Sequence, residues 1–198
     1  MPRLALNKTQ LTRESRQLDT YERFLPSLDL KRRQLIAERN KARREVADTA
    51  AEIEALEASC GKEIPMAADA RLRLKHLATV RSVELSQENV VGLRVPALAG
   101  VEVERVGYSF LARPHWVDAL GDMVEKLMRI RIRYQVLQQR LAILETAVKK
   151  TTQRVNLFDK VLIPQTRDNI RRIRIQLSDA EKAAVVNAKI AKRKRAAR

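Results

Sequence analysis

The chain has 198 residues, of which 32% are charged and only 4% aromatic, and it contains five glycines. So few aromatic residues and glycines are thin for a conventional globular core, yet the charged residues follow a helical periodicity that argues against simple disorder. The formal net charge is +16, and about +12 of it falls after residue 115. Such a basic segment could bind nucleic acid or an acidic membrane surface, and it is also typical of a solvated tail.

Targeting and redox signals are sparse. The first residues lack the long apolar core of a signal peptide. No window approaches the roughly 18 consecutive apolar residues of a membrane-spanning helix, so none is expected. Cys60, the single cysteine, cannot form an internal disulfide, which fits a reducing compartment without establishing one.

Residues 1–60 predict a long helix that begins near Asn7 or Thr9, either of which can cap it. Apolar residues recur at alternating steps of three and four, the a/d pattern of a coiled coil. Its clearest positions are Leu18, Leu25, Leu28, Leu35, Val46 and Ile53.

Charged residues interrupt this first seam at Glu14, Arg32 and Arg39. We expect their aliphatic stems to pack while the charges reach water, although polar seam residues can also set register. Pro26 removes an amide donor, but the seam continues on both sides of it, so a kink is expected rather than a break.

Residues 61–115 have a different composition, with four of the five glycines. Residues 67–79 predict a short helix. Val90–Val95 and Val101–Val106 predict a β-hairpin with its turn over Pro96–Gly100, because Val101 and Val103 alternate with glutamates as in a half-buried strand.

Residues 116–185 predict the second long helix, kinked near Pro164, and residues 186–198 form a basic tail. The a/d positions over Trp116–Leu162 are all apolar except Thr151. At 1.5 Å per residue, a helix over this stretch is about 70 Å long. Its main positions are Leu120, Leu127, Tyr134, Leu141, Leu144, Val148, Val155 and Phe158.

The fold class is therefore mainly α: a long antiparallel two-helix coiled coil with a small central insert of a short helix and a β-hairpin. The central insert must reverse the chain direction, which makes the two helices antiparallel. With that turn, Leu35 should lie roughly opposite Leu141, and Leu11 near Gln165.

Catalytic and ligand-binding motifs are missing from the sequence. It has no Gly-rich phosphate loop and no recognisable nucleophile motif. His76 and His115 lie far apart and do not make a metal-ligand spacing with one cysteine. Aromatic residues are too few to form a base-stacking platform, and Tyr21, Tyr134 and Phe158 fall on the seams, where we expect them to belong to the core. We expect no cofactor, no metal and no catalytic residue.

Short motifs stand near both ends of the chain. Near the N-terminus they are Asn7-Lys-Thr-Gln-Leu11 and Leu30-Lys-Arg-Arg-Gln-Leu35. Near the C-terminus they are Gln153-Arg-Val-Asn-Leu-Phe-Asp-Lys-Val-Leu-Ile-Pro164, Asn169-Ile-Arg-Arg-Ile173 and Leu177-Ser-Asp179. These segments resemble the D-subunit family of V-type and A-type ATPases. The order of long helix, mixed insert and long helix also matches, so the resemblance covers nearly the whole chain. Pro26 and the basic tail depart from the family pattern.

The resemblance implies a non-catalytic rotor shaft of a rotary, proton- or sodium-translocating ATPase. Its implied partners are the catalytic A and B subunits, the F subunit and the socket-like subunit on the membrane rotor ring, and no nucleic acid. It would be peripheral to the membrane, on the cytoplasmic side, through the complex. Candidate contacts to the catalytic hexamer are Lys31, Arg32, Arg33, Arg167, Arg171 and Arg172, which otherwise form a solvated face.

Two alternatives follow from charge and periodicity. One is a basic coiled coil that binds nucleic acid, although no reading motif supports it. The other is a scaffold hairpin of an unrelated assembly.

Overall fold

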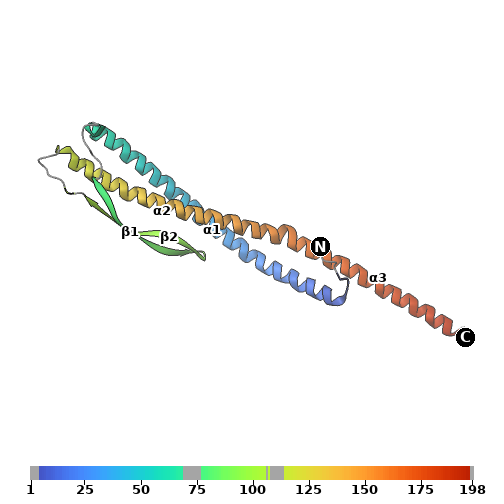
Figure 1. The fold of residues 1–198 in the computed structure, drawn as a ribbon. Coiled ribbons are helices and arrows are strands. Elements are labelled where there is room, and N and C mark those ends of the chain that lie inside the picture. Colours follow the sequence, from blue (N-terminus) through green and yellow to red (C-terminus); the bar gives the residue numbers. More distant parts are fainter. Residues whose placement is uncertain (1–4, 69–76, 106, 108–113, 197–198) are drawn as a thin grey trace. The chain divides into compact units, whose positions relative to one another are not determined.

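A computed structural model describes residues 5–68, 77–105, 107 and 114–196. The elements are α1 (Lys8–Glu63), the 3₁₀ turn η1 (Pro65–Ala68), β1 (Ala78–Val90), β2 (Leu93–Arg105), α2 (Trp116–Leu157), the π-helical turn η2 (Phe158–Leu162) and α3 (Ile163–Ala196) (Figure 1). Both predicted long helices are present, and the central insert contains a β-hairpin, although its strands differ from the predicted ones; this confirms the mainly α fold class.

Helix α1 begins where the sequence predicted. Asn7 caps it, because its side-chain Oδ1 accepts a hydrogen bond of 2.7 Å from the backbone N–H of Gln10. Pro26 lies inside the helix, which continues on both sides of it. The proline therefore does not break the helix.

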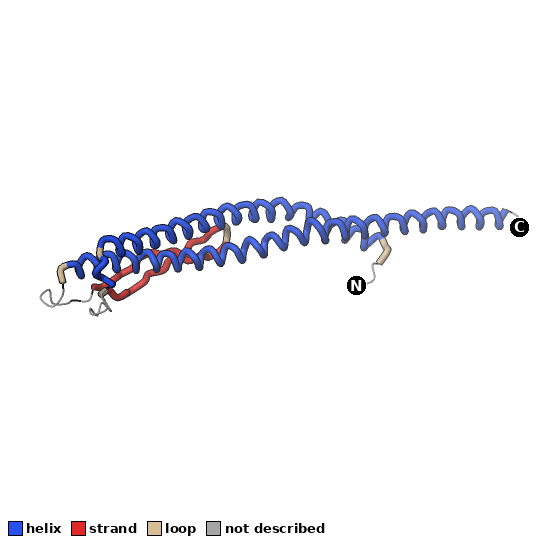
Figure 2. Tube along the Cα trace, turned by 90° about the horizontal axis from the view of Figure 1, so that it is seen from above, coloured by secondary structure: helices blue, strands red, loops and turns tan. Residues whose placement is uncertain are grey.

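The chain divides into two compact units, each described by itself: residues 33–149, and residues 1–32 together with 150–198. In the unit of residues 33–149, the second half of α1 and most of α2 pair, and the hairpin lies alongside them (Figure 2). One core cluster joins all three elements. Its buried members are Leu35, Ala42, Val95, Leu144, Ala147 and Val148.

The register of this pairing differs from the prediction by about one heptad. With Leu35 opposite Leu141, Cys60 would face Trp116, whereas Leu56 and Cys60 lie beside Met123 and Leu127. Leu35 and Leu144 are both fully buried in the shared cluster, and Leu141 packs against it. Two ion pairs bridge the helices at the surface, from Arg43 to Glu145 at 2.9 Å and from Arg131 to Glu57 at 2.6 Å.

The hairpin turn lies at Val91 and Gly92, so its predicted position was wrong. Val90 pairs with Leu93, and φ is 53° at Val91 and 80° at Gly92. Two positive φ values identify a two-residue type I′ turn, which suits the twist of a hairpin. A β-branched residue pays about 1–2 kcal/mol for this backbone conformation. The Val91 side chain packs against the core cluster, which offsets that cost.

The residues predicted to form the turn, Pro96 to Gly100, lie inside β2 instead. Hydrogen-bonded and non-hydrogen-bonded residue pairs alternate along an antiparallel ladder. Pro96 faces Gln87, three pairs beyond the Val90–Leu93 pair that closes the turn, so it occupies a non-hydrogen-bonded position whose N–H would point away from the partner strand. The missing N–H of Pro96 therefore costs no ladder hydrogen bond. The predicted helix over residues 67–79 was wrong at its end, because β1 begins at Ala78, whereas residues 67–68 lie in the 3₁₀ turn η1; residues 69–76 lie outside the described part.

In the other unit, the first half of α1 pairs with the end of α2, with η2 and with α3. Tyr21 and Phe158 meet edge to face across this pair, with ring centroids 5.3 Å apart. Asn169 donates a hydrogen bond of 3.3 Å to Glu14. The predicted pairing of Leu11 with Gln165 would place Glu14 about seven residues away from Asn169, so that register was wrong by about one heptad.

A π-helical turn precedes Pro164. The N–H of Ile163 donates to the carbonyl of Phe158, five residues earlier. Proline has no N–H for the carbonyl of Lys160, so an uninterrupted α-helix would leave that acceptor without its usual donor. The longer turn changes the pairing just before the proline and shifts the apolar face by about one residue. Beyond it the buried positions are Ile163, Thr166, Ile170 and Ile173.

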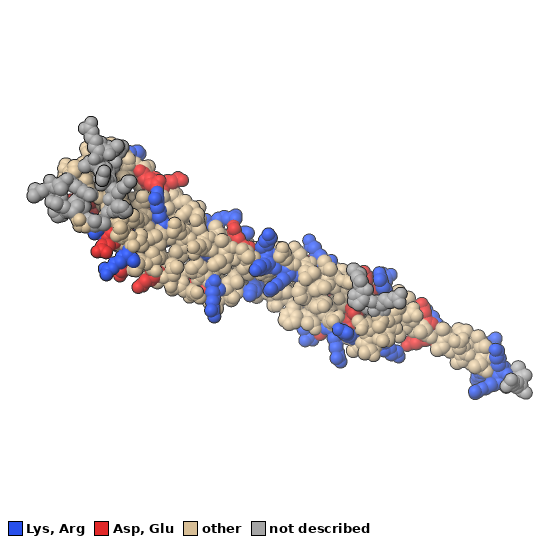
Figure 3. Space-filling model, viewed as in Figure 1, with Lys and Arg blue, Asp and Glu red and all other residues tan. Residues whose placement is uncertain are grey.

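The basic tail predicted for residues 186–198 is helical as far as Ala196. Every described residue after Leu177 is exposed, and Lys and Arg side chains gather at the end of α3 (Figure 3). Val185, Val186 and Ile190 are large apolar side chains among them. Across the described residues, no helix has both the length and the apolar run needed to cross a membrane.

Candidate functional site

The predicted seam residues point inward within each unit. Leu35, Leu120, Leu144, Val148 and Val155 are buried, and the half-buried ones are Leu18, Leu25, Leu28, Val46, Ile53, Leu127, Tyr134, Leu141 and Phe158. Because both seams are occupied by their partner helix, the surfaces available to other proteins are the outward faces of the helices and of the hairpin.

The three charged seam residues differ in their surroundings. Arg32 and Arg39 are half-buried, as expected for side chains whose stems pack and whose charges reach water. Glu14 is only 7% exposed, so the same expectation was wrong for it. Its carboxylate accepts hydrogen bonds from the amides of Gln10, at 2.8 Å, and Asn169, at 3.3 Å. These donors satisfy a buried charge that would otherwise be costly.

The predicted contact residues on α1 lie side by side in the chain. Lys31 and Arg33 are exposed. Arg32 donates to Asp29 one helical turn earlier, at 2.5 Å, so its guanidinium is held against its own helix. Of these three, Arg32 is the only half-buried residue.

The predicted contact residues on α3 separate into two groups. Arg167 and Arg171 line one groove, whereas Arg172, also exposed, does not. Arg167 also donates to Glu22 of α1 at 2.8 Å. The structure therefore brings together two of the three arginines that the sequence singled out.

That groove lies between α1 and α3 and encloses about 530 Å³. We call it the arginine groove; it is lined by Ser15, Leu18, Arg167, Ile170, Arg171, Arg174 and Ile175. Its described lining contains three cations and no carboxylate. Leu18, Ile170 and Ile175 give it an apolar floor and rim, so it combines positive charge with apolar surface.

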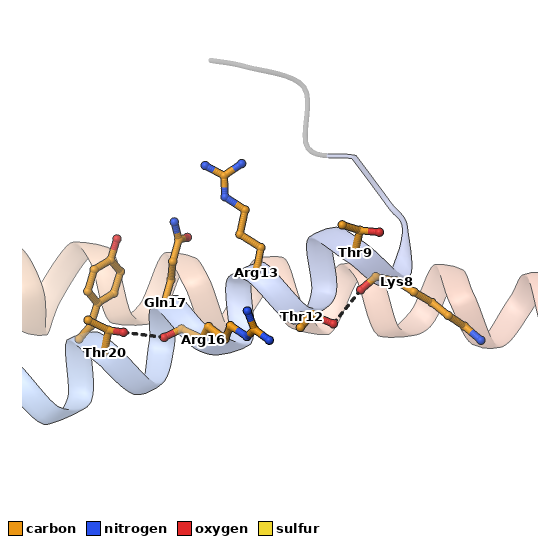
Figure 4. A pocket seen from close by; sticks show the side chains of 8 residues that line it. Lys8, Thr9, Thr12, Arg13, Arg16, Gln17 and Thr20 are labelled. Atoms are coloured by element: carbon orange, nitrogen blue, oxygen red, sulfur yellow. Dashed lines mark hydrogen bonds between the residues drawn. The ribbon is translucent and has the colours of Figure 1, made fainter.

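A second groove follows about the first four turns of α1. It is lined by Lys8, Thr9, Thr12, Arg13, Arg16, Gln17, Thr20 and Tyr21 (Figure 4). The hydroxyls of Thr12 and Thr20 donate to the backbone carbonyls of Lys8 and Arg16. These hydroxyls are therefore already bonded to the helix backbone, and the described lining of this groove comes from one helix only.

An ion-pair network ties the base of the hairpin to α2. Arg105 at the end of β2 donates to Asp122 and, at 3.0 Å, to Glu125, which also accepts from Arg129 at 2.8 Å. The hydrogen bonds from Arg105 and then Arg129 hold the pKa of Glu125 below its usual range. Nearer the hairpin tip, Arg140 donates to Glu88 at 3.0 Å.

Comparison with known proteins decides what kind of chain carries these surfaces. The family model for the D subunit of ATP synthase matches residues 10–193. The chain belongs to the ATP synthase D-subunit family. It is 30% identical to the V-type ATP synthase D subunit of Borreliella burgdorferi, over 97% of this chain and 95% of that relative. It is 33% identical to the V-type ATP synthase D subunit of Chlamydia trachomatis serovar A, over 96% of this chain and 95% of that one.

Membership of the D-subunit family confirms the resemblance seen in the sequence motifs. It gives no support to a basic coiled coil that binds nucleic acid. In the part of the chain that the structure describes, no three His, Cys, Asp or Glu side chains are placed to hold a metal ion together.

Sequence reasoning missed Arg174 and Ile175 as members of the arginine groove. Arg174 follows Arg167 by seven residues and Arg171 by three, which places all three on one face of a helix. That spacing could have identified Arg174. The contribution of α1, through Ser15 and Leu18, depends on the register and was not readable from the sequence.

Proposed function

We propose that this D-subunit chain is the central rotor shaft of a V-type or A-type rotary ATPase. It transmits torque between the hexamer of A and B subunits, where ATP is made or hydrolysed, and the ion-translocating membrane rotor. The observation that carries this proposal is the family match over residues 10–193. The coupled ion is a proton or a sodium ion.

The helical architecture suits a shaft. Torque transmission needs a stiff element, and paired helices with buried seams resist bending more than a single helix does. An asymmetric shaft contacts the catalytic interfaces of a hexamer unequally. Those unequal contacts bias each interface toward a different nucleotide affinity, as thermodynamic linkage requires. The shaft itself carries out no bond chemistry in this proposal.

The proposed partners follow from the shaft role. They are the catalytic A and B subunits, the F subunit and the socket-like subunit on the membrane rotor ring. The chain would be held at the membrane through these partners, on the cytoplasmic side. The proposed contacts to the catalytic hexamer are Lys31, Arg32, Arg33, Arg167, Arg171 and Arg172, whose cationic side chains would face carboxylates there.

An affinity pull-down tests the shaft role. The tagged chain is recovered from gently solubilised membranes, its partners are identified by mass spectrometry, and ATPase activity is measured. We expect A, B and F subunits with ATPase activity. Recovery of nucleic acid or unrelated soluble proteins, without ATPase subunits, would contradict the proposal.

Charge reversal tests the contact residues. Reversing Arg167, Arg171 and Arg172 together should weaken assembly or uncouple ATP hydrolysis from ion transport. Unchanged coupled activity would instead assign these arginines to a solvated face.

A further inference from the structure

We propose that the arginine groove binds a segment of the catalytic hexamer in which an Asp or Glu lies next to an apolar side chain. The inference rests on the shaft function proposed above and goes further, because it names one groove and the chemistry of the segment that fills it. It also adds Arg174 and Ile175 as contact residues and leaves Arg172 outside the groove.

The charges of the groove favour an anionic partner. Arg167, Arg171 and Arg174 line it, and its described lining has no carboxylate. Only Arg167 has an ion-pair partner, Glu22, among the described residues; Arg171 and Arg174 have none there. Two exposed guanidinium groups therefore remain available. A guanidinium binds a carboxylate with two parallel hydrogen bonds, a geometry that a lysine ammonium does not offer.

The apolar part of the groove selects among acidic partners. Ile170 is 7% exposed and forms part of the floor with Leu18, whereas Ile175 is 54% exposed at the rim. Burial of Ile175 by a partner side chain would be favourable and would exclude water from the neighbouring arginines. Exposed ion pairs alone contribute little, so a segment that carries both a carboxylate and an apolar side chain gains more than a purely acidic one.

Two helices build the groove, and this gives it a defined shape. Ser15 and Leu18 come from α1, and the remaining lining residues come from α3. The Arg167–Glu22 ion pair and the Asn169–Glu14 hydrogen bond join the same two helices beside it. The groove therefore depends on the pairing of α1 with α3 and not on one helix face.

A binding experiment with the A/B hexamer of the same complex tests the inference. The groove variant combines Arg171→Glu with Arg174→Glu. The matched control combines Arg133→Glu with Lys149→Glu, which changes the net charge equally at exposed cations of α2 outside the groove. We expect the groove variant to bind at least about tenfold more weakly than the wild type, and the control much less affected. Circular dichroism checks that both variants remain helical.

The outcomes separate the two proposals. If the wild-type chain does not bind the hexamer, the shaft function fails. If the wild type binds and the groove variant matches the control, the groove assignment is wrong while the shaft function stands.

A photo-crosslinking residue at position 175 then identifies the partner segment. We expect a crosslink to an A or B segment with an Asp or Glu within a few residues. A crosslink to the F subunit, to a segment without carboxylates, or no crosslink would overturn the proposed chemistry.

Discussion

Replacing Val95 with alanine tests how the hairpin is held on the helix pair. Val95 is completely buried in the cluster with Leu35 and Leu144, although it belongs to a strand of the two-stranded hairpin. The substitution removes two methyl groups, whose lost burial costs about 1.6 kcal/mol. The cavity left behind adds roughly 1 kcal/mol if its walls do not collapse. We therefore expect a loss of about 2–3 kcal/mol in the free energy of unfolding.

The matched control is Val83→Ala. Val83 lies in β1 and is 40% exposed, so the same chemical change should cost only a few tenths of a kcal/mol there. Urea unfolding followed by circular dichroism measures both variants, with hydrogen exchange of the hairpin amides as a second readout. Equal stability of the two variants within about 0.5 kcal/mol would refute the packing of Val95 between the helices.

Three further changes test particular contacts. Val91→Asn should change the unfolding free energy by less than about 1 kcal/mol, because relief of the left-handed backbone offsets the lost packing of a half-buried valine; a loss as large as that of Val95→Ala would contradict this. Glu125→Gln should lower the free energy of unfolding near neutral pH, because the stabilisation by Arg105 needs the Glu125 carboxylate. The difference in stability between variant and wild type should disappear as the pH falls through the lowered pKa of Glu125. A difference that does not vary with pH in denaturation measurements would exclude the Arg105–Glu125 ion pair as its cause. Asn169→Leu should lower the free energy of unfolding by about 1–3 kcal/mol, because it removes a hydrogen-bond donor to buried Glu14. Adding Glu14→Leu to this variant should recover most of the lost stability. Additive losses in a double-mutant cycle would show that the two side chains act independently.

Local spacing was enough to predict the two long helices and their inward faces. The apolar period is a property of each helix alone, and it identifies the buried face before any partner is known. The cap at Asn7 and the uninterrupted helix across Pro26 also followed from neighbouring residues. The family resemblance came from short motifs near both ends of the chain, and the match over residues 10–193 confirmed it.

The pairing between elements was decided only by the tertiary structure. A slip of one heptad brings seam against seam again, so periodicity could not distinguish the predicted partner of Leu11 from the observed register, in which Glu14 meets Asn169. Turn chemistry favoured Pro96–Gly100, but packing of Val91 and Val95 on the helix pair placed the turn at Val91–Gly92 instead. The arginine groove needs residues from both α1 and α3, so its existence depends on the same register. Sequence thus determined which faces are apolar, and long-range packing determined which faces meet.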